Sequence, residues 1–137
     1  MRRRRTHFGS RRGTAMVESA LVLLVFAVLI AGIMELGLIG FASNSVGFAA
    51  QRAARYAAVR GSGSGHPAST SDIQSVAQGY AAPLNSNSLT VTVTWTPNNN
   101  PGSTVRVQVA YSLKPSVLPI SSKALTLQGT ASQIVTQ

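Results

Sequence analysis

One long apolar run near the N-terminus constrains this chain more than any other feature. Residues Ser19–Ala42 read SALVLLVFAVLIAGIMELGLIGFA, and Glu35 is the only ionisable residue among them. About 20 apolar residues, each rising ~1.5 Å along a helix, cross the hydrocarbon core of a bilayer. The run is therefore predicted to be a transmembrane helix, which makes a membrane the first expected partner.

The charges around this run predict its orientation. The sequence holds 12 Lys and Arg residues, and six of them lie in the first twelve positions without an acid among them. Positive residues stay on the cytoplasmic side of a membrane segment. We expect a single-pass protein of the inner (cytoplasmic) membrane. Its N-terminus would lie in the cytoplasm, and everything after Ala42 would be periplasmic or extracellular.

Removable export signals are the alternatives to a permanent anchor. The apolar run is longer than the usual ~7–15 residues of a signal peptide, and residues 41–43 (FAS) form a poor cleavage site. A twin-arginine signal would begin at residues 10–12 (SRR), but residues 13–15 (GTA) do not continue that motif. The anchor is therefore the preferred interpretation.

Composition removes several classes of function. The chain has no cysteine, so it has no thiolate nucleophile and no Cys-ligated zinc. Its two histidines, His7 and His66, lie in polar, loop-like sequence away from any pair of carboxylates. No enzyme activity, cofactor or metal is therefore expected. Nucleic acid is not an expected partner either, because from Thr14 onward six bases against three acids leave a net charge of only +3.

The helical signal continues beyond the apolar run. Residues 43–60 are rich in alanine and contain no proline, so the first helix is predicted to extend from Thr14 to Arg60. Arg52, Tyr56 and Arg60 share one face of it, with Arg55 beside them. These arginines can face solvent or phospholipid, or they can contact a partner subunit. A second face consists of small residues suited to close packing: Val46, Ala49, Ala50, Ala53 and Ala57.

The remainder of the chain predicts a small α+β domain, residues 71–137. Residues 61–67 (GSGSGHP) are typical of a flexible joint, and 61–70 are assigned to a linker. Ser71-Asp72 is predicted to cap a short helix over 73–82, which Pro83 ends.

Three strands are then expected, over 89–96, 105–113 and about 124–135, with residues 97–102 (PNNNPG) as a hairpin turn. Apolar and Thr/Gln residues alternate along the first two. We predict a three-stranded antiparallel sheet with its apolar face on the first or the second helix, and Trp95 and Tyr111 in the core.

The start of the apolar helix carries a recognisable motif. Residues Gly13–Glu18 (GTAMVE), after a basic leader (1–13), resemble the processing site of type IV prepilins. Together with Glu35–Gly37 (ELG) and Ala53–Arg55 (AAR), the pattern resembles the TadE-like family of tight-adherence, Flp-type pilus systems. Two features depart from that family: Ser19 stands where an aromatic residue is common, and no proline occurs between Thr14 and His66.

This resemblance implies a pilin-like fold and a structural function. A prepilin peptidase would cut after Gly13, and the new α-ammonium of Thr14 would pair with Glu18 of a neighbouring subunit. The expected protein is a minor pilin or pseudopilin that assembles with other pilin-like subunits and the pilus machinery, or a related secretion apparatus. The leader-processing residues would be Gly13, Thr14 and Glu18, and the subunit-assembly residues Glu18, Glu35, Arg52 and Arg55.

Two alternatives remain at this stage. The chain could be an unprocessed bitopic membrane protein whose exported domain binds a partner or ligand. Glu18 and Glu35, which are about 25 Å apart along a helix, could also lie simply at the two membrane interfaces.

Overall fold

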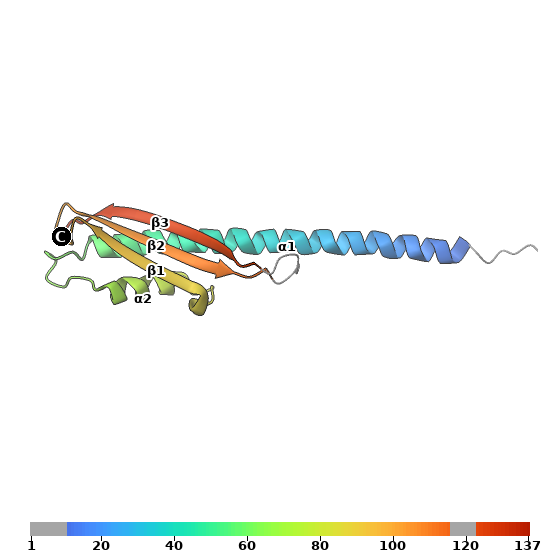
Figure 1. Cartoon of the computed structure of the whole chain (residues 1–137), viewed down its shortest axis with the longest axis horizontal. Coiled ribbons are helices and arrows are strands. Elements are labelled where there is room, and N and C mark those ends of the chain that lie inside the picture. The colour runs from blue at the N-terminus through green and yellow to red at the C-terminus, as the bar shows by residue number, and fades with distance from the viewer. Residues whose placement is uncertain (1–10, 116–122) are drawn as a thin grey trace, which may run out of the picture.

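The molecule is a long helix with a small sheet and a second helix packed along its C-terminal half (Figure 1). We call this C-terminal half of the long helix its outer half, and the N-terminal half its inner half. The computed structural model describes residues 11–115 and 123–137. Most of the predicted leader, and part of the loop before the third strand, lie outside the described residues. The described part contains α1 (Arg11–Ala58), α2 (Thr70–Tyr80), a 3₁₀ turn η1 (Ser86–Ser88), and strands β1 (Leu89–Thr96), β2 (Thr104–Leu113) and β3 (Leu125–Ile134). The predicted α+β class is confirmed.

Helix α1 has 48 residues, so it is about 72 Å long. It begins three residues before the predicted start and ends two residues before the predicted end. Beyond Ala58 the chain makes one tighter turn, in which the Arg60 N–H donates to the carbonyl of Ala57 (3.1 Å). The two halves of α1 differ in their surroundings, because every described residue from Gly13 to Ile30 is exposed.

The outer half of α1 belongs to the hydrophobic core. The predicted face of small residues is confirmed, since each of its members is fully buried: Val46, Ala49, Ala50, Ala53 and Ala57. Ala42, the last residue of the predicted transmembrane segment, is also buried there, at 2% exposure. The packed domain therefore includes the outer half of α1 as well as the sheet and α2.

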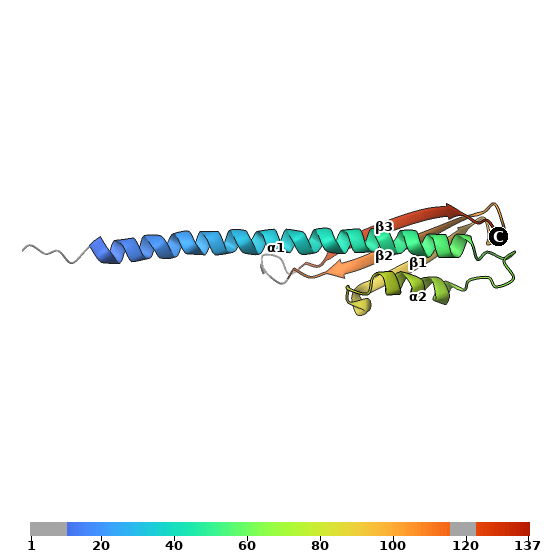
Figure 2. The same ribbon diagram turned by 180° about the vertical axis from the view of Figure 1, so that it is seen from behind.

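The sheet is an antiparallel meander in the order β1-β2-β3. Val105, Val107, Val109 and Tyr111 of the central strand point into the core, and their neighbours point away from it. This matches the predicted alternation, in which one face is apolar and the other carries Thr and Gln. Trp95 is half-buried and packs against the same core. Both helices cover the apolar face (Figure 2).

Strand β3 lies unusually close to α1. A Cβ atom on Gly129 would stand 2.7 Å from the carbonyl oxygen of Val46 and 2.8 Å from the backbone nitrogen of Gly47. A side chain at Gly129 would therefore collide with helix backbone, which cannot rotate aside. Glycine at this point lets the strand reach the helix.

The predicted flexible joint is held in place at its first residues. The Ser62 N–H donates to the Asn99 carbonyl (2.9 Å) and the Ser62 hydroxyl to Asn100 Oδ1 (2.8 Å), in the hairpin turn. Near the C-terminus, the Thr136 N–H donates to the Ala58 carbonyl (2.9 Å). The joint differs from a free linker because the hairpin turn, distant in sequence, bonds to Ser62, and the C-terminal segment bonds to the end of α1 just before the joint.

Helix α2 begins earlier than predicted, and its predicted cap is wrong. Ser69, not Ser71-Asp72, is the N-cap: its hydroxyl accepts the Asp72 N–H (3.2 Å), and the Asp72 carboxylate accepts the Ser69 N–H (3.0 Å). The reason is a reciprocal capping box, which places the acid at the third helical position. The helix ends at Tyr80, before Pro83, and Ala81 is its C-cap.

Candidate functional site

The residues predicted to be processed lie at the inner end of α1. Gly13, Thr14 and Glu18 occupy its first turns, and all three are exposed. A Cβ on Gly13 would meet nothing within 4 Å, so a larger residue fits there without strain. Glu18 stands four residues after Thr14, one turn along the helix. Within the described chain, nothing folds back over this end.

Glu35 lies seventeen residues after Glu18, about 25 Å along the axis. It is half-exposed and marks the level at which the domain begins to cover α1, since Ala31 and Gly32 are also half-exposed and the residues before them are not covered. The two acids therefore lie in different surroundings, one on bare helix and one at the base of the domain.

Arg52 is the predicted site residue with the most defined surroundings. Its guanidinium carbon lies 4.9 Å from the ring centre of Phe48 and 5.7 Å from that of Tyr80. The two rings meet edge to face, with centres 5.6 Å apart at 83°. Such contacts fix the direction of an arginine that is otherwise flexible. We call Phe48, Arg52 and Tyr80 the aromatic–arginine cluster.

Sequence reasoning missed both aromatic members of this cluster. Phe48 could have been found, because it precedes Arg52 by four residues and such pairs meet on a helix surface. Tyr80 carried no local signal, because it reaches Arg52 from the end of α2 only once the two helices have packed. On the predicted face of Arg52, Tyr56 and Arg60, the last two contact each other. The Tyr56 hydroxyl accepts a hydrogen bond from Arg60 Nη1 (2.8 Å), and the Arg60 guanidinium carbon lies 4.5 Å from the centre of the Tyr56 ring.

Taken together, the predicted site residues are spread along one helix. From Gly13 to Arg55 the axial distance is about 63 Å, so no single pocket contains them. Arg55 is exposed one turn beyond Arg52. An arrangement of this kind suits contacts between molecules along a helix rather than chemistry at one point.

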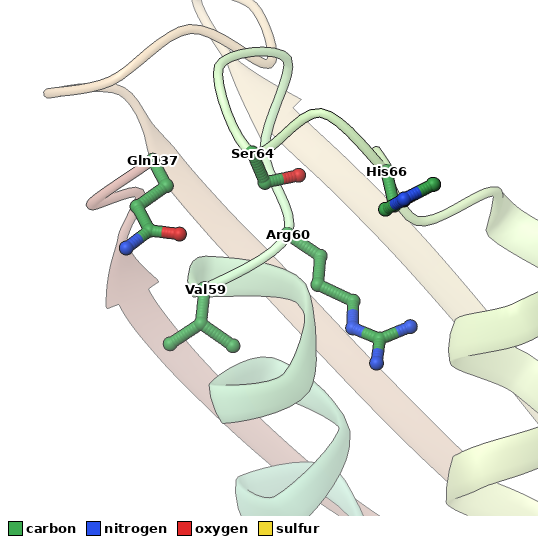
Figure 3. Close-up of a pocket in the computed structure, with 5 residues that line it drawn as sticks. All are labelled: Val59, Arg60, Ser64, His66 and Gln137. Carbon is green, nitrogen blue, oxygen red and sulfur yellow. The ribbon is translucent and has the colours of Figure 1, made fainter.

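A cavity of about 330 Å³ lies at the outer tip of the molecule (Figure 3). It is lined by Val59, Arg60, Ser64, His66 and Gln137, none of which was a predicted site residue. The Arg60 and His66 side chains lie on one side of its opening, and Gln137 lies on the other (Figure 3). The Ser64 hydroxyl already donates to the Gly61 carbonyl (2.8 Å), so this pocket contains no activated nucleophile.

Electrostatics outside the membrane segment centre on Asp72. The hydrogen bonds from the Ser69 hydroxyl (2.7 Å) and the Ser69 N–H hold the pKa of Asp72 below its usual range, and nearby Arg60 lowers it further. Both bonds favour the charged carboxylate. Asp72 is therefore a structural acid. Among the residues that the structure describes, no three His, Cys, Asp or Glu side chains gather as a metal site would require.

Comparison with known families now identifies the helix that carries these residues. Residues 13–55 match the TadE-like protein family. The predicted resemblance is confirmed, and the matched stretch begins at Gly13 and ends at Arg55, within α1. Comparisons with curated proteins and with solved structures gave no match.

The TadE-like stretch indicates a protein associated with the tight-adherence pilus. It lies within a helix, Gly13–Ala58, that is long and apolar enough to cross a membrane, and among the described residues this one candidate span indicates a single-pass membrane protein. The sheet and α2 lie outside the matched residues.

Proposed function

We propose that this protein is a prepilin-like structural subunit, a minor pilin or pseudopilin, of a tight-adherence (Flp-type) pilus or a related secretion apparatus. One observation supports the proposal most strongly. The helix that matches the TadE-like family is exposed and apolar along its inner half, and its outer half is buried in the core of a packed domain. A bare apolar helix is stable in lipid or in a bundle of like helices, and the first environment can give way to the second during assembly.

The proposed orientation follows from the leader. The N-terminus lies in the cytoplasm, where a prepilin peptidase cuts after Gly13, and the domain lies on the other side of the membrane. Cutting removes the six leading arginines and leaves the α-ammonium of Thr14 in apolar surroundings. Glu18 of a neighbouring subunit compensates that charge. Glu35, Arg52 and Arg55 contribute to contacts between subunits, and the role is structural rather than catalytic.

The cut at Gly13 tests the proposal directly. The intact mass of the protein from its native membrane should correspond to a chain that begins at Thr14. Gly13→Trp should remain uncut yet inserted, because the site has room for a larger side chain. A start just after Ala42 would indicate a removed signal peptide. An uncut wild-type chain would favour the bitopic protein whose domain binds a partner or ligand.

A further inference from the structure

The outer half of α1 presents a face that the sheet and α2 leave largely exposed, with Tyr80 at the end of α2 in contact with it. Phe41 and Phe48 lie on it at 52% and 45% exposure, with Arg52 and Arg55 further along. In Figure 2 this half of the helix lies in front of the sheet and runs directly into the bare inner half. Large apolar side chains beside ordered arginines are typical of a surface that contacts another molecule.

No acid of the same chain is placed to pair with Arg52. The sequence holds three acids, Glu18, Glu35 and Asp72. Asp72 is engaged by Ser69, and the two glutamates precede Arg52 by about 51 Å and 25 Å along the same straight helix. The Arg52 guanidinium carbon lies 4.9 Å from the ring centre of Phe48 and 5.7 Å from that of Tyr80, and contacts with the ring faces do not use up its N–H donors. A carboxylate from a second molecule would complete this site.

Glu35 of a second copy can supply this carboxylate, because of its spacing from Arg52 along α1. Glu35 precedes Arg52 by seventeen residues, and Ala31 precedes Phe48 by the same number. Two parallel copies displaced by seventeen residues, about 25 Å, would therefore meet at both points at once. The large ring of Phe48 would lie beside Ala31 and Gly32, which are small and half-exposed, while Glu35 would lie level with Arg52.

We propose that the aromatic–arginine cluster receives the α1 helix of a second copy of this chain. That copy is displaced about 25 Å outward along the helix axis, with its Glu35 opposite Arg52 and its Ala31 and Gly32 against Phe48. Glu35 already makes contacts within its own chain. A carboxylate has about four acceptor positions, so it can bind Arg52 as well.

This contact uses different surfaces on the two copies. Each copy offers its cluster to one neighbour and its Glu35 to another, so the interface is heterologous and does not close on itself as a two-fold dimer does. Repetition produces a filament in which all helices point the same way, because a displacement of about 25 Å along the helix axis at every step cannot close into a ring. The inference rests on the proposed function and adds the partner, the contact and the stagger.

The absence of cysteine makes the stagger measurable by cross-linking. The full-length chain, in cells that assemble it, would carry Ala31→Cys together with Phe48→Cys. Assembled material outside the membrane is analysed with the membrane fraction, because a displacement of about 25 Å moves most of the second copy's apolar run out of a hydrocarbon core about 30 Å thick. The matched control pairs Ala31→Cys with Phe41→Cys, on the same helix face but two turns lower. A disulfide needs Cα atoms within about 7 Å, so mild oxidation should produce about tenfold more cross-linked ladder from the first pair than from the control.

A charge exchange tests the same contact without cysteines. Arg52→Glu and Glu35→Arg should each abolish co-purification of tagged with untagged copies, and the double variant should restore it. Arg106→Glu, on the exposed face of β2, makes an equal change of charge and should have no effect.

Three results would overturn the inference. The first is cross-linking of Phe48→Cys alone, which would indicate a symmetric dimer. The second is equal cross-linking of the two cysteine pairs. The third is failure of the double charge variant to recover. If wild-type copies still co-purify with one another when any of these results is found, the proposed stagger is wrong but the assembly role stands. If wild-type copies do not associate at all, the proposed function fails with it.

Discussion

Glu18 is the acid on which the assembly mechanism depends. It is exposed on the bare half of α1, one turn from the proposed new N-terminus at Thr14. In an apolar bundle, removing one member of a buried ion pair costs about 3–5 kcal/mol, because the other charge is left unpaired. Glu18→Ala should therefore be made and inserted, yet fail to co-purify with its membrane partners.

Glu35→Gln is the milder change in the same measurement. The amide keeps a hydrogen-bonding oxygen, and Glu35 lies at the base of the domain, where water is closer. Recovery of each variant should be normalised to its level in the membrane. Equal recovery of Glu18→Ala and wild type would rule out the ion-pair mechanism even if the cut after Gly13 were found.

Strand β3 approaches the backbone of α1 closely at Gly129. Gly129→Ala would drive a Cβ into the backbone at Val46 and Gly47, and overpacking of this kind costs about 1–3 kcal/mol. Trp95 is the only tryptophan and packs against the core, so its fluorescence during thermal unfolding of the full chain in detergent reports the loss.

Gly79→Ala in α2 is the matched control for this substitution. Its Cβ would meet nothing within 4 Å, so the change should stabilise the protein by about 0.4–1 kcal/mol. If both variants unfolded at the wild-type temperature, the close approach of β3 to α1 would not require glycine at position 129.

The capping box of α2 predicts a pH dependence. The folded-state pKa of Asp72 lies below its ordinary value of 3.8, chiefly because of the Ser69 hydroxyl. The contribution of the ionised Asp72 carboxylate to the stability of the folded protein is therefore complete above about pH 3.8. It is lost as the pH falls through the folded-state pKa. Ser69→Ala should cost about 1 kcal/mol at neutral pH. The difference in Tm between wild type and Asp72→Asn should shrink in acid, and a constant difference would contradict this assignment.

The whole molecule is polarised along α1. Six arginines precede the apolar run, and the folded domain packs along the opposite half of α1, which is about 72 Å long in total. The proposed orientation predicts that a reporter active only in the cytoplasm is silent when fused after Gln137. A periplasm-dependent reporter at the same position should be active. The reverse pair of results would overturn both the orientation and the pilin role.

The sequence by itself determined the elements whose signals are local. The apolar run and the alanines after it predicted α1, because helix formation and membrane crossing depend on neighbouring residues. Alternation of period two predicted β1 and β2, and the spacing of Gly13, Glu18 and Glu35 led to the TadE-like family. The cap at Ser69 could also have been read from its Ser-x-x-Asp pattern, but Ser71-Asp72 offered a competing start.

Only the tertiary structure decided where these elements meet. Ala42 became a core residue because the sheet packs against the outer end of the apolar run, and Gly61 was closed in by Val135 and Gln137. Tyr80 met Arg52 because α2 packs beside α1. Each of these contacts joins residues far apart in the chain, so no local periodicity records it. They arise when apolar faces on different elements bury one another, and that is why Arg52 has a defined geometry only in the folded protein.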